Sequence, residues 1–137
     1  MSPLTFLMLY GLTALVFFIV DLVWLGVVAA GFYQSHLGHL LRPDVVWGAA
    51  LVFYLLYIAG VLVFAVLPGL DAGSLTRTLA LGAFFGLVAY ATFDLTCMAL
   101  MRDFPPVVVV VDLIWGMALT TSVSAAGFVI GRWLGVA

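Results

Sequence analysis

The sequence predicts an all-α membrane protein, a four-transmembrane-helix antiparallel bundle that forms a single integral membrane domain over residues 1–137. Apolar residues make up 67% of the chain and charged residues only 7%, whereas soluble domains average about 45–50% apolar and roughly 25% charged residues. The apolar residues gather in four stretches, each longer than the roughly 20 residues that cross a hydrocarbon core as a helix. Helices are expected because a backbone in lipid must satisfy its own hydrogen bonds.

The four predicted helices follow one another with short connections. They cover about residues 4–30, 45–67, 75–101 and 107–130. The second connection, Pro68 to Ser74, is expected to be a turn because of its Pro, Gly, Asp and Ser content. The third, Arg102 to Pro106, is expected to be a hairpin whose prolines begin the last helix. Connections this short make successive helices antiparallel neighbours.

The few charges suggest an orientation. Four crossings place both termini on one side, together with Arg77 and Arg132, whereas Arg42 and Arg102 lie on the other side. With the α-amino group added, the positive-inside rule favours a multi-pass protein whose N- and C-termini are cytoplasmic. The difference is small, so insertion in both orientations stays an alternative.

Missing residue types exclude several classes of function. The chain contains no lysine, which excludes Schiff-base chemistry and a phosphate-binding P-loop. The net charge of -2 without a basic cluster argues against nucleic acid as a partner. A single cysteine, Cys97, excludes an intramolecular disulfide and a cysteine-rich metal site. We expect no cofactor.

Three aspartates, Asp21, Asp94 and Asp112, lie inside the predicted spans. A charged residue at the centre of a membrane helix costs about 2.5–3.5 kcal/mol on insertion scales. At about 1.5 Å of rise per residue, the three lie roughly 14, 10 and 8 Å from the membrane face opposite the termini. With cytoplasmic termini, this is the periplasmic face. Each aspartate alone could be structural, but three at one depth favour a functional polar site.

Residue spacing directs these aspartates toward neighbouring helices. A stripe of the third helix, at intervals of four residues, contains Gly82, Gly86, Tyr90 and Asp94. A similar stripe of the fourth helix contains Asp112, Gly116, Thr120 and Ser124. Because glycines allow close approach of membrane helices, the stripes predict helix contacts and not lipid-facing surfaces.

Aromatic residues accompany the aspartates. Trp24 and Trp115 each follow an aspartate by three residues, within the similar segments DLVWLG and DLIWGM. Since helices one and four run in opposite directions, the two segments are expected near the same membrane face. Each indole N–H is expected to donate to the aspartate of its own helix. Tyr54, Tyr57 and Tyr90 are expected to belong to the same cavity.

His36 and His39 are weak candidates for metal ligands. They are three residues apart in the first connection, and Asp21 or Asp112 would have to complete the site. A solvated segment near the lipid headgroups explains the same pattern, and we favour it. We therefore expect no metal site.

The motifs also resemble a known family. The matching segments are DLVWLG followed by FY, HLGHLL, FYLLYIAGVLVF followed by Pro68, GLVAYATFDLT, and VVDLIWG. They are similar to the bacterial membrane proteins catalogued as domain of unknown function twenty-one seventy-seven. The resemblance covers nearly the whole chain. It implies four helices, a bacterial cytoplasmic (inner) membrane, and importance of Asp21, Asp94 and Asp112. The family pattern often has Tyr and Asn where this chain has Phe93 and Cys97, so roles at these two positions do not carry over.

Three functions are compatible with these features, and the sequence leaves open whether the protein is an enzyme. The first is the handling of a membrane lipid or another hydrophobic small molecule, with the aspartate layer holding its polar head. The second is a proton- or cation-coupled transporter or channel, with a homodimer as one form. The third is a structural or assembly subunit that uses Gly127 and Gly131 as a packing face. We rank the first highest.

Overall fold

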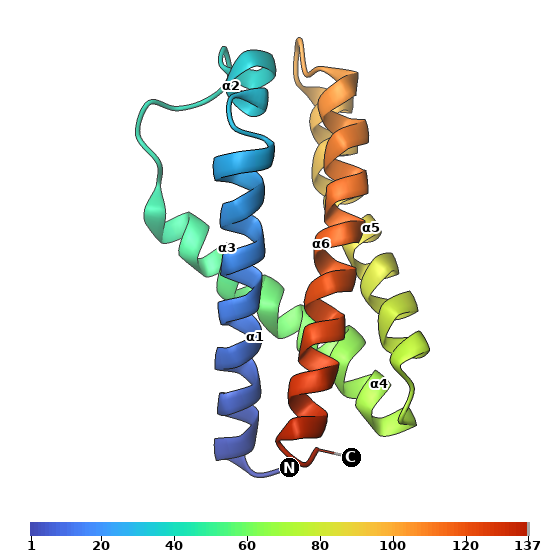
Figure 1. Ribbon diagram of the computed structural model, residues 1–137. Coiled ribbons are helices and arrows are strands. Elements are labelled where there is room, and N and C mark those ends of the chain that lie inside the picture. Colours follow the sequence, from blue (N-terminus) through green and yellow to red (C-terminus); the bar gives the residue numbers. More distant parts are fainter. Residues whose placement is uncertain (137) are drawn as a thin grey trace.

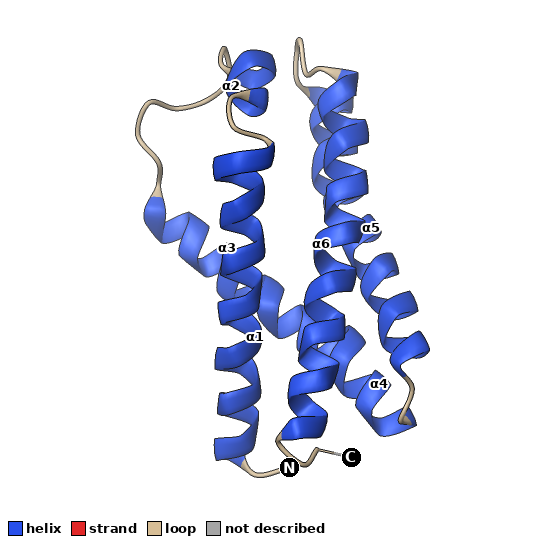
Figure 2. Cartoon of the chain, in the orientation of Figure 1, coloured by secondary structure: helices blue, strands red, loops and turns tan. Residues whose placement is uncertain are grey.

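The computed structural model describes residues 1–136 and confirms an all-α fold with four helical spans. The elements are α1 (Pro3–Val23), η1 (Trp24–Val28), α2 (Phe32–Leu37), α3 (Trp47–Val61), η2 (Leu62–Val66), α4 (Leu67–Ala72), α5 (Leu75–Leu100) and α6 (Pro106–Trp133). The described residues form no strand (Figure 2). Both termini lie at one end of the bundle and α2 lies at the other, as four crossings require (Figure 1).

The second span is longer than the sequence predicts. Pro68 to Ser74 was expected to be a turn, which is wrong for most of the segment: helix continues to Ala72, and only Gly73 and Ser74 connect the spans. The turn η2 is π-helical, and the Leu67 N–H donates to the Leu62 carbonyl five residues back. The wide turn interrupts the regular i to i−4 hydrogen bonds of the α-helix just before Pro68. Pro68 lacks an N–H and could not have formed such a bond.

Each span presents apolar side chains to its lipid-facing side. On α1 the exposed side includes Leu4, Leu7, Leu15, Ile19 and Leu22. The buried side of the same helix repeats every four residues and contains Leu9, Thr13, Phe17 and Asp21. Helical periodicity therefore brings Asp21 to the interior together with the apolar core.

The glycine stripes form the contact between α5 and α6. A Cβ atom at Gly86 would collide with the Gly116 carbonyl group and with Thr120. A Cβ atom at Gly82 would meet the Ser124 side chain in the same way. The expectation that both stripes face neighbouring helices is confirmed, and Asp94 lies on the buried face of α5.

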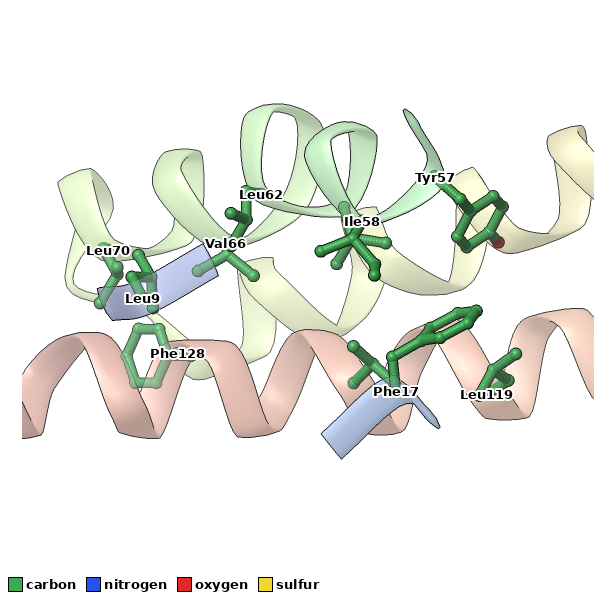
Figure 3. Packing of buried hydrophobic residues seen from close by; sticks show 11 residues of the cluster. Leu9, Phe17, Tyr57, Ile58, Leu62, Val66, Leu70, Leu119 and Phe128 are labelled. Carbon is green, nitrogen blue, oxygen red and sulfur yellow. The ribbon is translucent and has the colours of Figure 1, made fainter. Parts of the chain in front are cut away.

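The half of the bundle near the termini is a closely packed apolar core (Figure 3). Leu9, Ile58, Leu62, Val66, Leu70 and Phe128 are among its buried members. A Cβ atom at Gly127 would meet Val66, and one at Gly131 would meet Leu70. Both glycines therefore form a packing face of α6 against η2 and α4 of the same chain.

Candidate functional site

A cavity of about 430 Å³ lies in the other half of the bundle, away from the termini. Its lining consists of three aspartates, eight aromatic residues and two small or aliphatic residues: Asp21, Trp24, Leu25, Tyr33, Phe53, Tyr54, Tyr57, Ala89, Tyr90, Phe93, Asp94, Asp112 and Trp115. All eight candidate residues selected from the sequence border this single cavity. They come from α1, η1, α3, α5 and α6, so the site exists only once all four spans have packed.

Asp21 enters the cavity from the first span. Its carboxyl group is 8% exposed and accepts a hydrogen bond of 3.3 Å from the Tyr54 hydroxyl group on α3. The Trp115 side chain of α6 lies beside it. Partners from two other helices thus hold Asp21, which accounts for a carboxyl group at this depth.

Asp112 is held by a chain of hydrogen bonds that passes through Tyr33, outside the spans. The Tyr33 hydroxyl group on α2 donates to Asp112 Oδ1 at 2.7 Å, and the Trp24 indole N–H donates to the Tyr33 hydroxyl oxygen at 3.0 Å. The expectation that Trp24 donates to Asp21 on its own helix is therefore wrong. A spacing of three residues along one helix does not predict the hydrogen-bond partner here. The Tyr33 hydroxyl group lies between the Trp24 indole and Asp112, which belongs to another helix.

Asp94 has no protein partner. Its side chain is 1% exposed, and neither carboxyl oxygen forms a hydrogen bond with any described residue. Asp112 is its acidic neighbour. Two carboxylates side by side only accept hydrogen bonds, so neither can serve as the donor to the other. An unpartnered carboxyl group at this burial is unusual and needs a proton or a ligand.

Aromatic rings form most of the cavity wall. Trp24 and Trp115 stack face to face, with centroids 4.4 Å apart and planes 8° apart. This contact shows that the two similar segments lie side by side in the bundle. Tyr57 and Tyr90 meet edge to face at 6.2 Å, and the Tyr57 hydroxyl group lies 2.6 Å from the Thr120 hydroxyl group. These rings close the cavity toward the core.

The cavity opens sideways toward the lipid. The side chains of Leu25, Phe53 and Phe93 line it and remain 44%, 50% and 64% exposed. They belong to η1, α3 and α5, respectively. Figure 1 shows α3 crossing the bundle obliquely, so that its N-terminal half leaves the other spans. The mouth is therefore apolar and is formed by residues of three of the spans.

Several lining residues were not predicted from the sequence, of which Tyr33 matters most. Tyr33 lies on a short helix, α2, that packs over the ends of α5 and α6 against Phe104 and Val108. Gly31, with a φ of 82°, lets the chain reverse before α2. Burial and the neighbouring Asp112 raise the pKa of Tyr33, so its hydroxyl group stays a donor. The signal was the apolar pattern Phe32, Tyr33 and Leu37 within an otherwise polar connection.

The histidines lie outside the cavity lining. His36 Nδ1 is 2.9 Å from the Phe32 carbonyl oxygen, and His39 Nε2 is 3.0 Å from the Asp103 carbonyl oxygen. Among the described residues, no group of three His, Cys, Asp or Glu side chains is placed to hold a metal ion.

A family model described as "Predicted membrane protein (DUF2177)" matches residues 6–129. The chain belongs to this family. The matched range of DUF2177 contains every residue that lines the cavity. No curated protein and no solved structure matches the chain. The family description identifies a membrane protein and assigns no activity.

Proposed function

We propose that this protein binds a lipid or another amphiphilic molecule, with the polar head at the three aspartates and the apolar tail in the surrounding membrane. The observation that carries the proposal is one cavity that combines three intramembrane carboxyl groups with an apolar, lipid-facing mouth. Ligand cavities are commonly apolar with a few converging polar groups. Here the three carboxyl groups come from three different helices, α1, α5 and α6, and packing between any two of these helices would not require all three.

The sideways mouth suits an amphiphile better than a water-soluble molecule. A tail that leaves through Leu25, Phe53 and Phe93 stays in hydrocarbon throughout binding. The binding free energy then depends on the head, which moves from the interfacial region to the carboxyl groups. Orphan Asp94 is the group that gains most from a head with hydrogen-bond donors or a positive charge.

The aspartate layer is proposed to lie near the periplasmic face of a bacterial inner membrane, with cytoplasmic termini. Support comes from the position of the cavity at the end opposite both termini (Figure 1) and from the arginine distribution. In this orientation the site is accessible to molecules of the outer leaflet. A second copy of the chain is not required for the cavity, because one chain supplies its whole lining.

Proton-coupled transport is the second candidate, and one arrangement favours it. Asp94 and Asp112 are neighbouring carboxyl groups in the wall of one cavity, and membrane carboxylates commonly relay protons. The packed core near the termini argues against an open channel in this conformation. Proton uptake into proteoliposomes that depends on Asp94 would favour transport over binding alone.

Native mass spectrometry of the protein extracted from its membrane tests the binding proposal. The parent is compared with a variant carrying Asp21→Asn, Asp94→Asn and Asp112→Asn, and with the control Asp103→Asn in the exposed loop. A discrete bound mass is expected in the parent and the control and not in the triple variant. The same bound masses in all three folded proteins would contradict a ligand site at the aspartates.

A further inference from the structure

The cavity is electrostatically one-sided. Of the thirteen described residues that line it, three are aspartates and none is lysine, arginine or histidine. The four arginines of the chain lie elsewhere in the sequence, at the ends of spans or in connections. Buried carboxyl groups in proteins are normally paired with a cation or fully hydrogen-bonded. The protein supplies neither for Asp94, whose two oxygens are orphaned at 1% exposure.

We propose that the head of the bound amphiphile is an organic ammonium group, seated between Asp94 and the Trp24–Trp115 stack. This inference rests on the proposed function and specifies its ligand. The ammonium group supplies the missing positive charge, and the aromatic walls surround the alkyl groups on its nitrogen. Proteins recognise alkylated ammonium groups in this way, with ring faces around the cation.

The aromatic lining favours an organic cation over a metal ion. The described residues offer no cluster of His, Cys, Asp or Glu with the geometry of a metal site. The cavity is instead bordered by eight aromatic side chains and has a volume of about 430 Å³, far more than a bare ion occupies. A cation over an aromatic face is attracted by the ring electrons, most strongly when both are desolvated.

The same lining disfavours an anionic head. A phosphate or carboxylate in the cavity would face three acidic side chains with no basic side chain among the lining residues, and like charges at short range repel strongly. The ammonium group could come from a zwitterionic lipid such as phosphatidylethanolamine or from a single-chain amine. In the first case the phosphate must remain outside the cavity.

Binding of matched amphiphiles to the parent protein tests the inference directly. Purified protein in a neutral maltoside detergent is titrated with dodecyltrimethylammonium and with dodecyldimethylphosphine oxide, which has a similar tail and a neutral head. The ammonium compound is expected to bind at least about tenfold more tightly, which corresponds to about 1.4 kcal/mol. Adducts in native mass spectra and the shift in unfolding temperature are the two readouts. This comparison needs no variant that could fail to fold.

The outcomes separate the inference from the proposed function. Equal binding of the two compounds would overturn the ammonium site and leave an amphiphile site standing, whereas binding of neither would overturn both. With Asp94→Asn the preference for the ammonium compound should disappear, and with the loop control Asp103→Asn it should persist. A preference that survives Asp94→Asn would also overturn the assignment.

The source of the ammonium group is tested in lipid nanodiscs. Phosphatidylethanolamine is compared with phosphatidylglycerol, which has the same phosphate and no ammonium group. Selective retention of phosphatidylethanolamine by the parent supports a lipid head as the source. Retention of neither lipid, together with tight dodecyltrimethylammonium binding, supports a single-chain amine. Selective retention of phosphatidylglycerol would contradict the inference.

Discussion

Asp94 and Asp112 show how differently two carboxyl groups of one site can be supported. Asp112 receives a hydrogen bond from Tyr33, which in turn receives one from Trp24. Asp94 receives none. A buried acceptor without a donor destabilises the fold by about 1–3 kcal/mol. Asp94 therefore lowers the stability of the fold, which is typical of binding sites and unusual for a purely structural polar contact.

Tyr33→Phe is expected to destabilise the protein by about 1–2 kcal/mol at neutral pH, because it removes the donor to Asp112 and the acceptor for Trp24. The raised pKa of Tyr33 gives this effect a pH dependence. The contribution is complete below the unfolded pKa of about 10 and is lost as pH rises toward the folded pKa. Denaturant unfolding in detergent at neutral and alkaline pH measures both.

A matched control for this prediction is Tyr10→Phe. The Tyr10 hydroxyl group donates to the Leu55 carbonyl oxygen at 2.6 Å, away from the cavity and the aspartates. Its removal should lower stability without changing ligand binding. A Tyr33→Phe protein as stable as the parent, at neutral pH, would show that the chain from Trp24 to Asp112 does not form.

At the level of individual residues, most members of the site were predictable from the sequence, whereas their hydrogen-bond partners were not. Charge in an apolar span is costly, so Asp21, Asp94 and Asp112 could be recognised as candidates. Which donor meets which carboxyl group depends on the rotation and tilt of each helix, and spacing along one helix does not determine these. For the same reason Tyr33, which reaches the site from a connection, was missed.

Among the elements, α5 and α6 form the tightest pair because glycines line their contact. Gly86→Ala is expected to destabilise the protein by about 1–3 kcal/mol, since the added methyl group meets the Gly116 carbonyl group and Thr120. The collision involves backbone, which gives way less readily than a flexible side chain. Chemical or thermal unfolding in detergent provides the measurement.

Gly11→Ala is the control for this effect. A Cβ atom at Gly11, within α1, meets no atom within 4 Å. Since alanine favours helix over glycine, this variant should be as stable as the parent or more stable by up to about 1 kcal/mol. Equal effects of Gly86→Ala and Gly11→Ala would mean that α5 and α6 do not approach closely at this point.

Helix number and order followed from hydropathy, because length and apolar content decide what spans a membrane. The end of the second span did not follow, because composition around Pro68 indicated a turn. A proline ends a helix only where the backbone cannot adjust, and the wide turn η2 supplies the adjustment. Local π-helical geometry leaves no reliable mark in the sequence, so the continuation of the helix past Pro68 could not be predicted from composition.

The whole molecule divides into a packed half near the termini and an open half that contains the cavity. Because the two halves differ, the orientation of the chain in the membrane determines which leaflet and which compartment the aspartates face. The arginines favour one orientation only weakly. Arg77 lies in the first turn of α5 and Arg132 in the last turn of α6, at the end with the termini, whereas Arg42 and Arg102 lie in the connections at the other end. A single added arginine should therefore move the balance.

Two added arginines at opposite ends test the orientation. Ala72→Arg places a charge at the exposed end of α4, near the termini, and Ser35→Arg places one at an exposed position of α2. Because positive charge is retained in the cytoplasm, Ala72→Arg should keep the C-terminus cytoplasmic, and Ser35→Arg should move a fraction of the molecules to the opposite orientation. C-terminal fusions to a reporter active only in the cytoplasm and to one active only outside it measure the ratio. A C-terminus outside the cytoplasm in the parent would place the aspartate layer, and any ligand it binds, at the cytoplasmic face instead.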